Sequence, residues 1–323
     1  MLYQKLTDIY KQYQKFKNFS HISDSYWSER LSNNNISPKS VEFDTASQQL
    51  FLKPLNLFLS KDKHDFLIKS KVLDNAKILQ KALDTKFYLD KEQNLIAELQ
   101  GTKFIVENEQ DIDIIKEIYF YGIYNFVYDK PVVVVDIGMN LGFASLYFAS
   151  RSNVVAVFGY EPFKITYQQA LKNFALNPEI SQKITPCQYG IAEQEQTLMI
   201  EFDYDVKGSI GMEGIDKNFK PSPDKKLATA EMKLKATKDV FQSILEQYPD
   251  IDIVAKVDCE GAEYEIFKVL SETGQLSRIK MIMMEWHKKG PAPLLNYLNK
   301  AGFATFSRLP ASKNVGLLYA VRA

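Results

Sequence analysis

Apolar residues follow two different spacings along the chain, and the change falls near Leu95. Over residues 1–92 they recur at intervals of three and four, which is typical of helices. Residues 32–35, Ser-Asn-Asn-Asn, are a turn signal within this region. The predicted helices cover residues 2–19, 50–59 and 66–89. We therefore expect residues 1–92 to form a helical accessory region and residues 93–323 to form the main domain.

From Leu95 onward, short apolar runs of strand length alternate with helical patterns. Residues 96–99 and 103–106 alternate like a hairpin, and residues 111–119 have the pattern of a helix. Further strands are predicted at residues 132–135, 153–160, 183–190, 251–257, 279–284, 304–307 and 316–321. Further helices are predicted at residues 143–150, 165–176, 238–247, 262–270 and 294–300. This alternation predicts an α/β fold with a mostly parallel sheet covered by helices, closed by an antiparallel pair around residues 310–314.

The strand at residues 132–135, four consecutive valines, leads into Asp-Ile-Gly-Met-Asn-Leu-Gly at residues 136–142. A β-branched run of this kind is typical of a buried parallel strand. Gly138 and Gly142 allow a sharp turn and a close approach of the backbone to a ligand. The next strand ends at an acid, Glu161, about 20 residues beyond the glycines, where a carboxylate can accept hydrogen bonds from ribose hydroxyls. The unit is built for a nucleoside-bearing cofactor.

The glycine pattern is D-x-G-x-N-x-G and not the G-x-G-x-x-G of dinucleotide sites. A dinucleotide needs successive glycines because its pyrophosphate lies against the turn and the helix N-terminus. S-adenosylmethionine has no phosphate, so a looser loop suffices, with Asp136 facing its amino group and Glu161 its ribose. The predicted cofactor-binding residues are Asp136, Gly138, Asn140, Gly142 and Glu161.

Charged residues follow the predicted strand at 251–257, and a third strand ends near Glu285 and His287. Ligands of open α/β sheets bind beyond the carboxyl ends of the strands, so these polar residues are expected to face one crevice. Acids at a helix start also serve as caps and favour the helix dipole, which is an alternative for Glu263 above all. The charged residues after the strand are Lys256, Asp258, Glu260 and Glu263.

Four segments together resemble the FkbM-type methyltransferases. They are residues 136–142 (DIGMNLG), 160–162 (YEP), 256–263 (KVDCEGAE) and 284–287 (MEWH). The block at 256–263 is the most specific of the four, and residues 102–124 resemble the segment that precedes the first strand in that family. Met139 and Cys259 depart from the usual family residues, but neither removes a polar group.

The resemblance covers roughly residues 95–323. It implies a class I, Rossmann-like methyltransferase fold, with a mostly parallel sheet and an antiparallel last strand. It also implies an S-adenosylmethionine-dependent O-methyltransferase that acts on a hydroxyl of a sugar, a glycan or another natural product.

Methyl transfer to a hydroxyl requires a general base within hydrogen-bond reach of the attacking oxygen. The candidates are Asp258, Glu260 and His287, and the acids are preferred because their block resembles the family more specifically. Lys256 can fix a carboxylate by a charge-assisted hydrogen bond. No metal is assigned, although Asp258, Glu260 and Glu263 offer the oxygen ligands that Mg²⁺ prefers.

The amino-acid composition restricts which ligands and partners are expected. Lysine plus arginine equals aspartate plus glutamate, 40 against 40, which disfavours a nucleic-acid binder. The two cysteines and three histidines lack metal-ligand spacing. A polar N-terminus and the lack of an apolar run of about 20 residues predict a cytoplasmic protein without a membrane span. The expected partner is a small-molecule or glycan substrate.

Two other functions remain open. A nicotinamide-dependent oxidoreductase would use a related sheet, but the dinucleotide glycine pattern is missing. An inactive, methyltransferase-like binding module is disfavoured by the intact motif residues. The helices of residues 1–92 must bury their apolar faces, either on the main domain or in a homo-oligomer. Residues 193–235 are either a wall of the substrate pocket or a solvent-facing loop.

Overall fold

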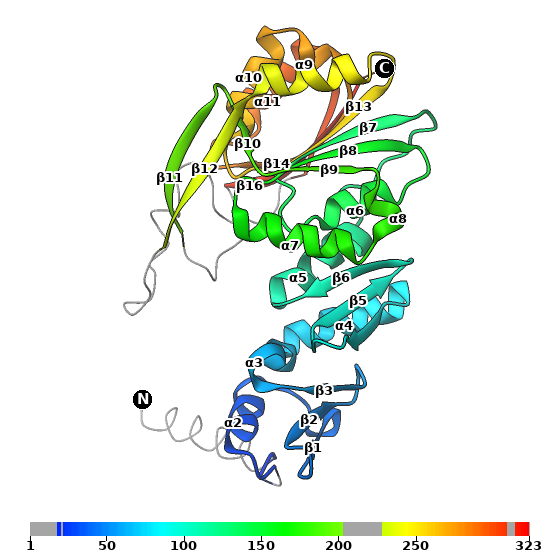
Figure 1. Cartoon of the computed structure of the whole chain (residues 1–323), viewed down its shortest axis with the longest axis vertical. Coiled ribbons are helices and arrows are strands. Elements are labelled where there is room, and N and C mark those ends of the chain that lie inside the picture. The colour runs from blue at the N-terminus through cyan, green and yellow to red at the C-terminus, as the bar shows by residue number, and fades with distance from the viewer. Residues whose placement is uncertain (1–17, 21, 203–227, 309–313, 323) are drawn as a thin grey trace. The chain divides into compact units, whose positions relative to one another are not determined.

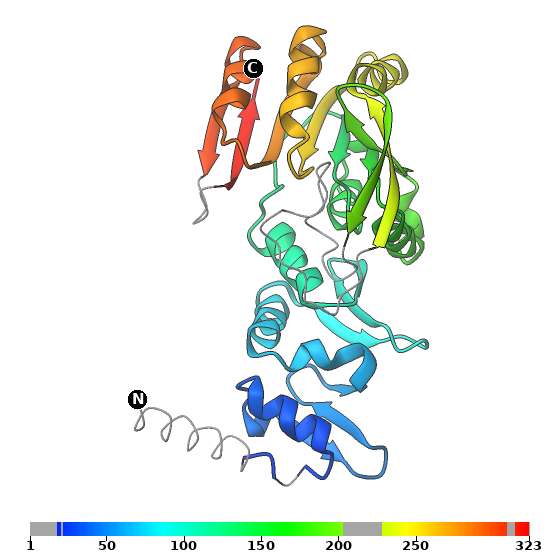
Figure 2. The ribbon, with the colours of Figure 1, turned by 90° about the vertical axis from the view of Figure 1, so that its left-hand side faces the viewer.

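The structure, a computed structural model, describes most of the chain. The described residues are 18–20, 22–202, 228–308 and 314–322. The helix predicted at residues 2–19 and the turn around residues 310–314 lie almost entirely outside them. The described residues form two units, which Figures 1 and 2 show in two views.

The first unit is Met1–Ile123 and the second is Tyr124–Ala323. The predicted hairpin is formed by β5 (Leu95–Leu99) and β6 (Thr102–Val106), and β4 (Lys86–Leu89) pairs with β5 on its other side. This three-stranded antiparallel sheet spans the point near residue 92 at which the sequence predicts a boundary. The boundary between the two units therefore lies after Ile123 rather than near residue 92, because this sheet joins the residues on both sides of position 92.

The segment predicted as a helix at residues 50–59 forms strands, so that prediction is wrong. β2 (Gln49–Leu52) pairs antiparallel with β3 (Leu57–Leu59) and, on its other edge, with β1 (Val41–Asp44). The leucines at alternate positions of β2 and β3 are buried and the residues between them are more exposed. That period of two is the signature of a half-buried strand, and it prevails over the intervals of three and four.

The helices of the first unit are short. They are α2 (Ser25–Asn33), η1 (Pro38–Ser40), α3 (Lys61–His64), η2 (Asp65–Ile68), α4 (Ser70–Leu83), α5 (Glu109–Ile115) and the π-helical turn η3 (Lys116–Phe120). The helix predicted at residues 66–89 is confirmed only over Ser70–Leu83, because Asp84 adopts a left-handed conformation that ends α4. For residues 86–89 the prediction is wrong, since they form β4 and pair with β5. Asn108 and Asp111 form a capping box at the start of α5. Within the described part of the chain, no helix has the length and apolar character needed to span a membrane.

His64 gives the first unit a pH-dependent stability. The backbone N–H of Ser60 donates to Nδ1 at 3.1 Å, and Nε2 lies 3.0 Å from the carbonyl oxygen of Gln93, so the buried ring is held neutral. Burial lowers the pKa of His64, and the neighbouring Lys63 lowers it further, although Gln93 opposes both. Below the unfolded pKa of about 6.5, the unfolded chain therefore binds more protons and folding weakens.

We expect the free energy of unfolding to fall between pH 7.5 and pH 5.5, and His64→Gln to reduce that fall, because glutamine keeps a donor and an acceptor but does not titrate. Urea unfolding of both proteins at the two pH values measures the effect. An identical pH dependence in the variant would show that His64 does not contribute.

The second unit is built on a seven-stranded sheet in the order β15-β16-β14-β13-β7-β8-β9. Its strands are β7 (Val132–Ile137), β8 (Val154–Tyr160), β9 (Ile184–Cys187), β13 (Asp252–Val257), β14 (Ile279–His287), β15 (Ala304–Arg308) and β16 (Val315–Val321). All neighbouring pairs are parallel except those of β16, which runs antiparallel to both β14 and β15. Every residue of β7 is buried, as expected for a central strand covered on both faces. This is the Rossmann-like class I methyltransferase arrangement that the sequence predicts.

Helices cover both faces of this sheet (Figure 1). Those on one face are α6 (Phe143–Ala149), α7 (Lys164–Ala175) and α8 (Pro178–Ser181). Those on the other are α9 (Thr237–Gln247), α10 (Glu263–Glu272) and α11 (Ala292–Lys300), with the turn η4 (Gln275–Arg278). One large apolar core lies between the sheet and the helices α9, α10 and α11. The predicted helices in this part of the chain are confirmed to within two residues at each end.

The segment at residues 193–235 contributes a second, small sheet. β11 (Gln196–Phe202) and β12 (Ala228–Ala236) form an antiparallel pair, and β10 (Gly190–Ala192) joins the other edge of β12 in parallel. Residues 203–227, which connect β11 to β12, lie outside the described part of the chain. Both ends of the segment at residues 193–235 are therefore strands that pair with each other.

Candidate active site

The loop after β7 contacts the loop after β13 backbone to backbone. Gly138 has a φ of +81°, and a Cβ built on it would lie 1.7 Å from the carbonyl oxygen of Asp258. The N–H of Asp258 donates to the carbonyl oxygen of Ile137 at 2.9 Å. Gly142, the N-cap of α6, also has a positive φ, and a Cβ there would meet the ring of Phe174 at 2.5 Å. Both glycines of the motif are therefore required by space as well as by conformation.

Lys256 is a buried residue that contacts both of these loops. Its side chain is 3 % exposed, and its Nζ lies 3.1 Å from Oδ1 of Asp136 and 3.9 Å from Oδ2 of Asp258. The same ammonium donates to the carbonyl oxygen of Gly138 at 2.5 Å. Burial disfavours its charge, but the attraction of Asp136 and Asp258 prevails and raises the pKa of Lys256. Lys256 is thus a charged structural link between the two loops.

Asp136 is completely buried, so the structure surrounds it with protein groups. The hydroxyl of Ser145 donates to its Oδ2 at 2.6 Å, while Oδ1 faces Lys256. In this arrangement its carboxylate fixes the start of the motif loop, through the lysine that also holds Gly138.

Glu161 lies at the end of β8 and holds the motif loop from the other side. Its Oε2 accepts the backbone N–H of Asn140 at 2.9 Å. Its Oε1 accepts the N–H of Phe163 at 3.0 Å and the hydroxyl of Thr166 at 2.9 Å. Burial raises the pKa of Glu161 despite these three donors. The acid predicted from its spacing to the glycines is therefore in direct contact with the motif, 21 residues away in sequence.

The loop between β13 and α10 carries the acidic block. Glu260 has a φ of +55° and Gly261 a φ of +111°, so the chain turns sharply here. Glu263 is completely buried, and its Oε2 accepts the N–H of Gly261 at 2.8 Å. Its Oε1 accepts the N–H of His287 at 2.6 Å. Glu263 is therefore a structural acid that joins this turn to the end of β14.

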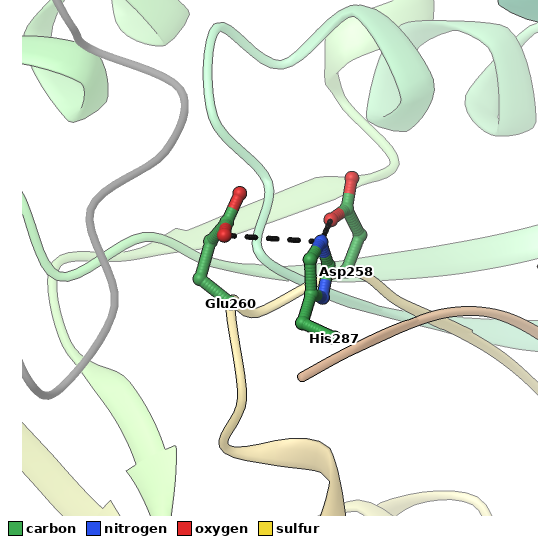
Figure 3. Close-up of side chains that lie close together, drawn as sticks. All are labelled: Asp258, Glu260 and His287. Carbon is green, nitrogen blue, oxygen red and sulfur yellow. Dashed lines mark ion pairs between the residues drawn. The ribbon is translucent and has the colours of Figure 1, made fainter. Parts of the chain in front are cut away.

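His287 lies among the carboxylates of the block (Figure 3). The strand β14 is longer than predicted and ends at His287 itself, which pairs with Val315. The imidazole Nε2 lies 3.9 Å from Oδ1 of Asp258 and 3.8 Å from Oε2 of Glu260. It also lies 4.0 Å from Oε1 of Glu285. The structure thus brings Asp258, Glu260 and His287 together, as the sequence predicts for the carboxyl ends of neighbouring strands.

The electrostatics of this cluster separate the roles of its members. Burial opposes the charge of His287, but contact with Glu263 and the charges of Glu260 and Asp258 prevail and raise its pKa to about 9. Burial raises the pKa of Glu260 to about 7, against the opposing effect of His287. At neutral pH the imidazole therefore holds a proton, whereas Glu260 is poised to take one. A general base works best when its pKa is near the operating pH, which favours the acids.

Tyr124 is a site residue that the sequence does not single out. Its ring is buried, its hydroxyl donates to Oδ2 of Asp258 at 3.3 Å, and Lys256 Nζ lies 5.4 Å from the ring centroid. Its position eight residues ahead of β7 carries no chemical pattern of its own. The weak signal available was its place at the end of the segment 102–124, which resembles the family.

Comparison with known proteins agrees with this geometry. The family model described as the methyltransferase FkbM domain matches residues 136–304, slightly more than half of the chain. The chain belongs to the FkbM methyltransferase family. The match begins at Asp136, the first residue of the glycine motif, and includes both loops and the end of β14. This member of the FkbM family is therefore a methyltransferase that uses S-adenosylmethionine.

Relatives of this FkbM-family chain are distant. Methyltransferase sdnD of Sordaria araneosa is 27 % identical over 187 residues, which are 51 % of this chain and 70 % of that protein. The solved structure of methyltransferase FkbM from Methylobacillus flagellatus KT is 15 % identical, with a TM-score of 0.40, over 64 % of this chain and 47 % of that one. A human methyltransferase 10 domain containing protein is 12 % identical, with a TM-score of 0.41, over 78 % of this chain and 94 % of that one.

The residues around the motif loop fit S-adenosylmethionine. Oδ1 of Asn140 is buried and accepts no hydrogen bond from the described residues, and a buried acceptor of this kind is usually completed by a ligand or water. The loop has the D-x-G-x-N-x-G pattern, which suits a cofactor without a pyrophosphate. At Gly138 the neighbouring loop leaves no room for a side chain. Glu161 accepts the N–H of Asn140, so the carboxylate that follows β8 lies directly beside the motif loop.

Proposed function

We propose that this FkbM-family methyltransferase methylates a hydroxyl oxygen of a small molecule or a glycan. The observation that carries the proposal is the cluster of Asp258, Glu260 and His287 at the carboxyl ends of β13 and β14, beside the motif loop. A hydroxyl must lose its proton as it attacks, and this cluster offers carboxylates to receive it. An acceptor that is already nucleophilic would need no such group.

The proposed cofactor-binding residues are Asp136, Gly138, Asn140, Gly142 and Glu161. When bound, S-adenosylmethionine supplies a methyl group on a positively charged sulfur. Gly138 and Gly142 keep the loop backbone free of side chains, and Asn140 offers a buried acceptor to the cofactor's polar groups. Asp136 contributes indirectly, by fixing the motif loop, because Lys256 and Ser145 occupy its carboxylate.

In the proposed reaction, Glu260 accepts the hydroxyl proton at its carboxylate, with Asp258 as the alternative acceptor. Their side chains are 25 % and 31 % exposed, so both are open to an acceptor that enters from solvent. His287, protonated at neutral pH, keeps the carboxylates close together by charge. Lys256 is a positioning residue, since it orients Asp258 and the motif loop from a buried position.

The balanced charge of the chain, 40 basic against 40 acidic residues, favours a small-molecule or glycan acceptor over a nucleic acid. A cytoplasmic location and assembly through the N-terminal helices stay predictions.

The test is mass spectrometry of hydroxyl-bearing sugars, glycans and small natural products incubated with the protein and S-adenosylmethionine. We expect the added mass of one methyl group on an oxygen, and a loss of turnover in Asp258→Asn and Glu260→Gln far greater than any loss of affinity for S-adenosylhomocysteine. Methylation at nitrogen or carbon would contradict the proposal. Rates near wild type in both variants would remove the two acids as candidate bases.

Glu161→Gln is expected to weaken binding of S-adenosylhomocysteine about 10- to 100-fold, since a hydrogen bond to a charged group contributes about 1.5–3 kcal/mol. Some loss of stability should accompany it, because the carboxylate also accepts from Asn140, Phe163 and Thr166. Calorimetric titration measures the affinity. Glu179→Gln, at an exposed acid of α8, is the matched control and should bind as the wild type does. Equal affinity in the two variants would make Glu161 a purely structural acid.

A further inference from the structure

The cluster around His287 has a geometry that acid–base catalysis alone does not require. Asp258, Glu260 and His287 each offer one ligand atom, and the three atoms lie within 4.8 Å of one another. The separations from Nε2, 3.9 Å to Asp258 and 3.8 Å to Glu260, are too long for hydrogen bonds. His287 therefore lies at ion-pair distance from both carboxylates, without a hydrogen bond to either (Figure 3).

His287 is the second, independent sign of a ligand. Its side chain is 8 % exposed, and the buried Nδ1 accepts or donates no hydrogen bond to the described residues. Nε2 is directed at Asp258 and Glu260, as Figure 3 shows. The nitrogen that faces the two carboxylates, Nε2, lies at ion-pair distance from both and within hydrogen-bond distance of neither, so the space between the three groups can accept an ion.

Neighbouring residues fix the positions of these side chains, as the residues around a metal site fix its ligands. Glu263 Oε1 lies 3.7 Å from Nδ1 of His287, and it also binds that residue's backbone N–H, so it limits the position of the ring. Tyr124 donates to Oδ2 of Asp258, which leaves Oδ1 turned toward His287. Orientation of the ligands by such neighbours is the rule in metal sites. Both oxygens of Glu263 bind backbone N–H groups, so it is not a ligand in this site. The ligand set that the sequence offers, Asp258, Glu260 and Glu263, differs in this residue.

The charge balance points the same way. Oxygen atoms of four carboxylates, those of Asp258, Glu260, Glu263 and Glu285, lie within 4.0 Å of the imidazole nitrogens. The positive charges near these carboxylates are the imidazolium, Lys288, which acts on Glu260, and Lys256, which Asp258 shares with Asp136. Three positive charges do not offset five carboxylates. A divalent cation would offset the remaining negative charge.

We propose that Asp258, Glu260 and His287 bind one divalent cation, with two carboxylate oxygens and Nε2 of the imidazole as its protein ligands. Binding of the cation displaces the proton from Nε2 to solvent, because only the neutral imidazole can bind a metal ion. Adjacent ligands at about 2.1 Å from a cation lie about 3 Å apart, so closing the site from separations of up to 4.8 Å shortens them by about 1–2 Å. A mixed set of oxygen and nitrogen ligands suits Mn²⁺, Fe²⁺ or Zn²⁺ better than Ca²⁺. Three protein ligands leave coordination positions open to water or to another oxygen.

The role of the cation in the reaction rests on the proposed function. An acceptor hydroxyl bound at an open position would lose its proton more readily, because a cation stabilises the alkoxide. Glu260 and Asp258 would then act as ligands, and the proton would pass to solvent or to a carboxylate oxygen that is not bound to the cation. The binding site itself needs neither the acceptor nor the cofactor.

The test is calorimetric titration of the full-length, chelator-treated protein with Mn²⁺ alone, supported by electron paramagnetic resonance of the bound ion. We expect one Mn²⁺ per chain. Asp258→Asn, Glu260→Gln and His287→Gln should each weaken it at least about 10-fold. Glu272→Gln, an exposed acid at the end of α10, is the control and should bind as the wild type does. Thermal melts of all variants verify that they are folded, and competition with Mg²⁺ and Zn²⁺ ranks the cations.

The outcomes separate the two proposals. No Mn²⁺, Mg²⁺ or Zn²⁺ binding, or binding that the three variants leave unchanged, overturns the cation site. Cation binding without methylation of any hydroxyl leaves the site standing and counts against O-methyl transfer. Methylation of a hydroxyl at an undiminished rate after chelation supports O-methyl transfer and removes the cation from the reaction.

Discussion

Gly138→Ala is expected to destabilise the second unit by about 2–5 kcal/mol and to abolish measurable cofactor binding. The left-handed φ of +81° costs about 1–2 kcal/mol for a residue with a Cβ. The Cβ would also lie 1.7 Å from the carbonyl oxygen of Asp258, which must move, and forced packing of this kind costs about 1–3 kcal/mol. Urea unfolding and titration with S-adenosylhomocysteine measure the two effects.

Gly274→Ala is the control that separates the cost of a left-handed φ from the cost of a steric clash. Gly274 has a similar φ of +75°, but no atom lies within 4 Å of the position that a Cβ would take, and the residue follows α10 away from the motif loop. We expect it to lose about 1–2 kcal/mol and to bind the cofactor normally. If Gly138→Ala behaved in the same way, the two loops would not be packed as closely as the structure shows.

Lys256→Met is expected to destabilise the second unit by about 3–5 kcal/mol, because it leaves Asp136 charged and buried without its cation. Methionine has a similar length and fills the same space, so the lost charge and the lost hydrogen bond to Gly138 account for the effect. Asp136→Asn in the same chain should recover part of the loss, since an amide needs no counter-charge. Urea unfolding of the single and double variants forms a double-mutant cycle.

Lys268→Met is the matched control. Lys268 pairs with Glu193 at 2.9 Å, but both side chains are about two-fifths exposed, so water screens the pair. We expect a far smaller change than at Lys256. A comparable loss at the two positions would mean that the pair in the interior is no more important than one at the surface.

Several features were determined by local sequence. The valine run of β7 is apolar on both faces, so it has to be a central strand, and it ends where Gly138 permits the turn. The strands and helices of the second unit follow in the predicted order because periods of 2 and 3.6 are properties of neighbouring residues. Asp258, Glu260 and His287 were expected to lie close together because the carboxyl ends of parallel strands meet at one edge of a sheet, and the structure places them so.

Other features depend on contacts between residues far apart in the chain. The strands at residues 50–59 were missed because each has only three or four residues, so its period of two covers too few positions to stand out from spacings of three and four. The boundary after Ile123 follows from the pairing of β4 with β5 across residue 92. In both cases the backbone hydrogen bonds that fix the element come from partners that no local window contains.

The detailed roles within the site were also decided only by the tertiary structure. Glu263 resembles Glu260 in sequence, yet it is completely buried and holds His287, whereas Glu260 is open to solvent. Tyr124 joins the site through Asp258, from 134 residues away. The sequence determines which polar groups reach the edge of the sheet. Which of them binds the backbone, which stays charged and which faces a ligand depends on burial and distance, because the free energy of a charged group is set by the atoms around it.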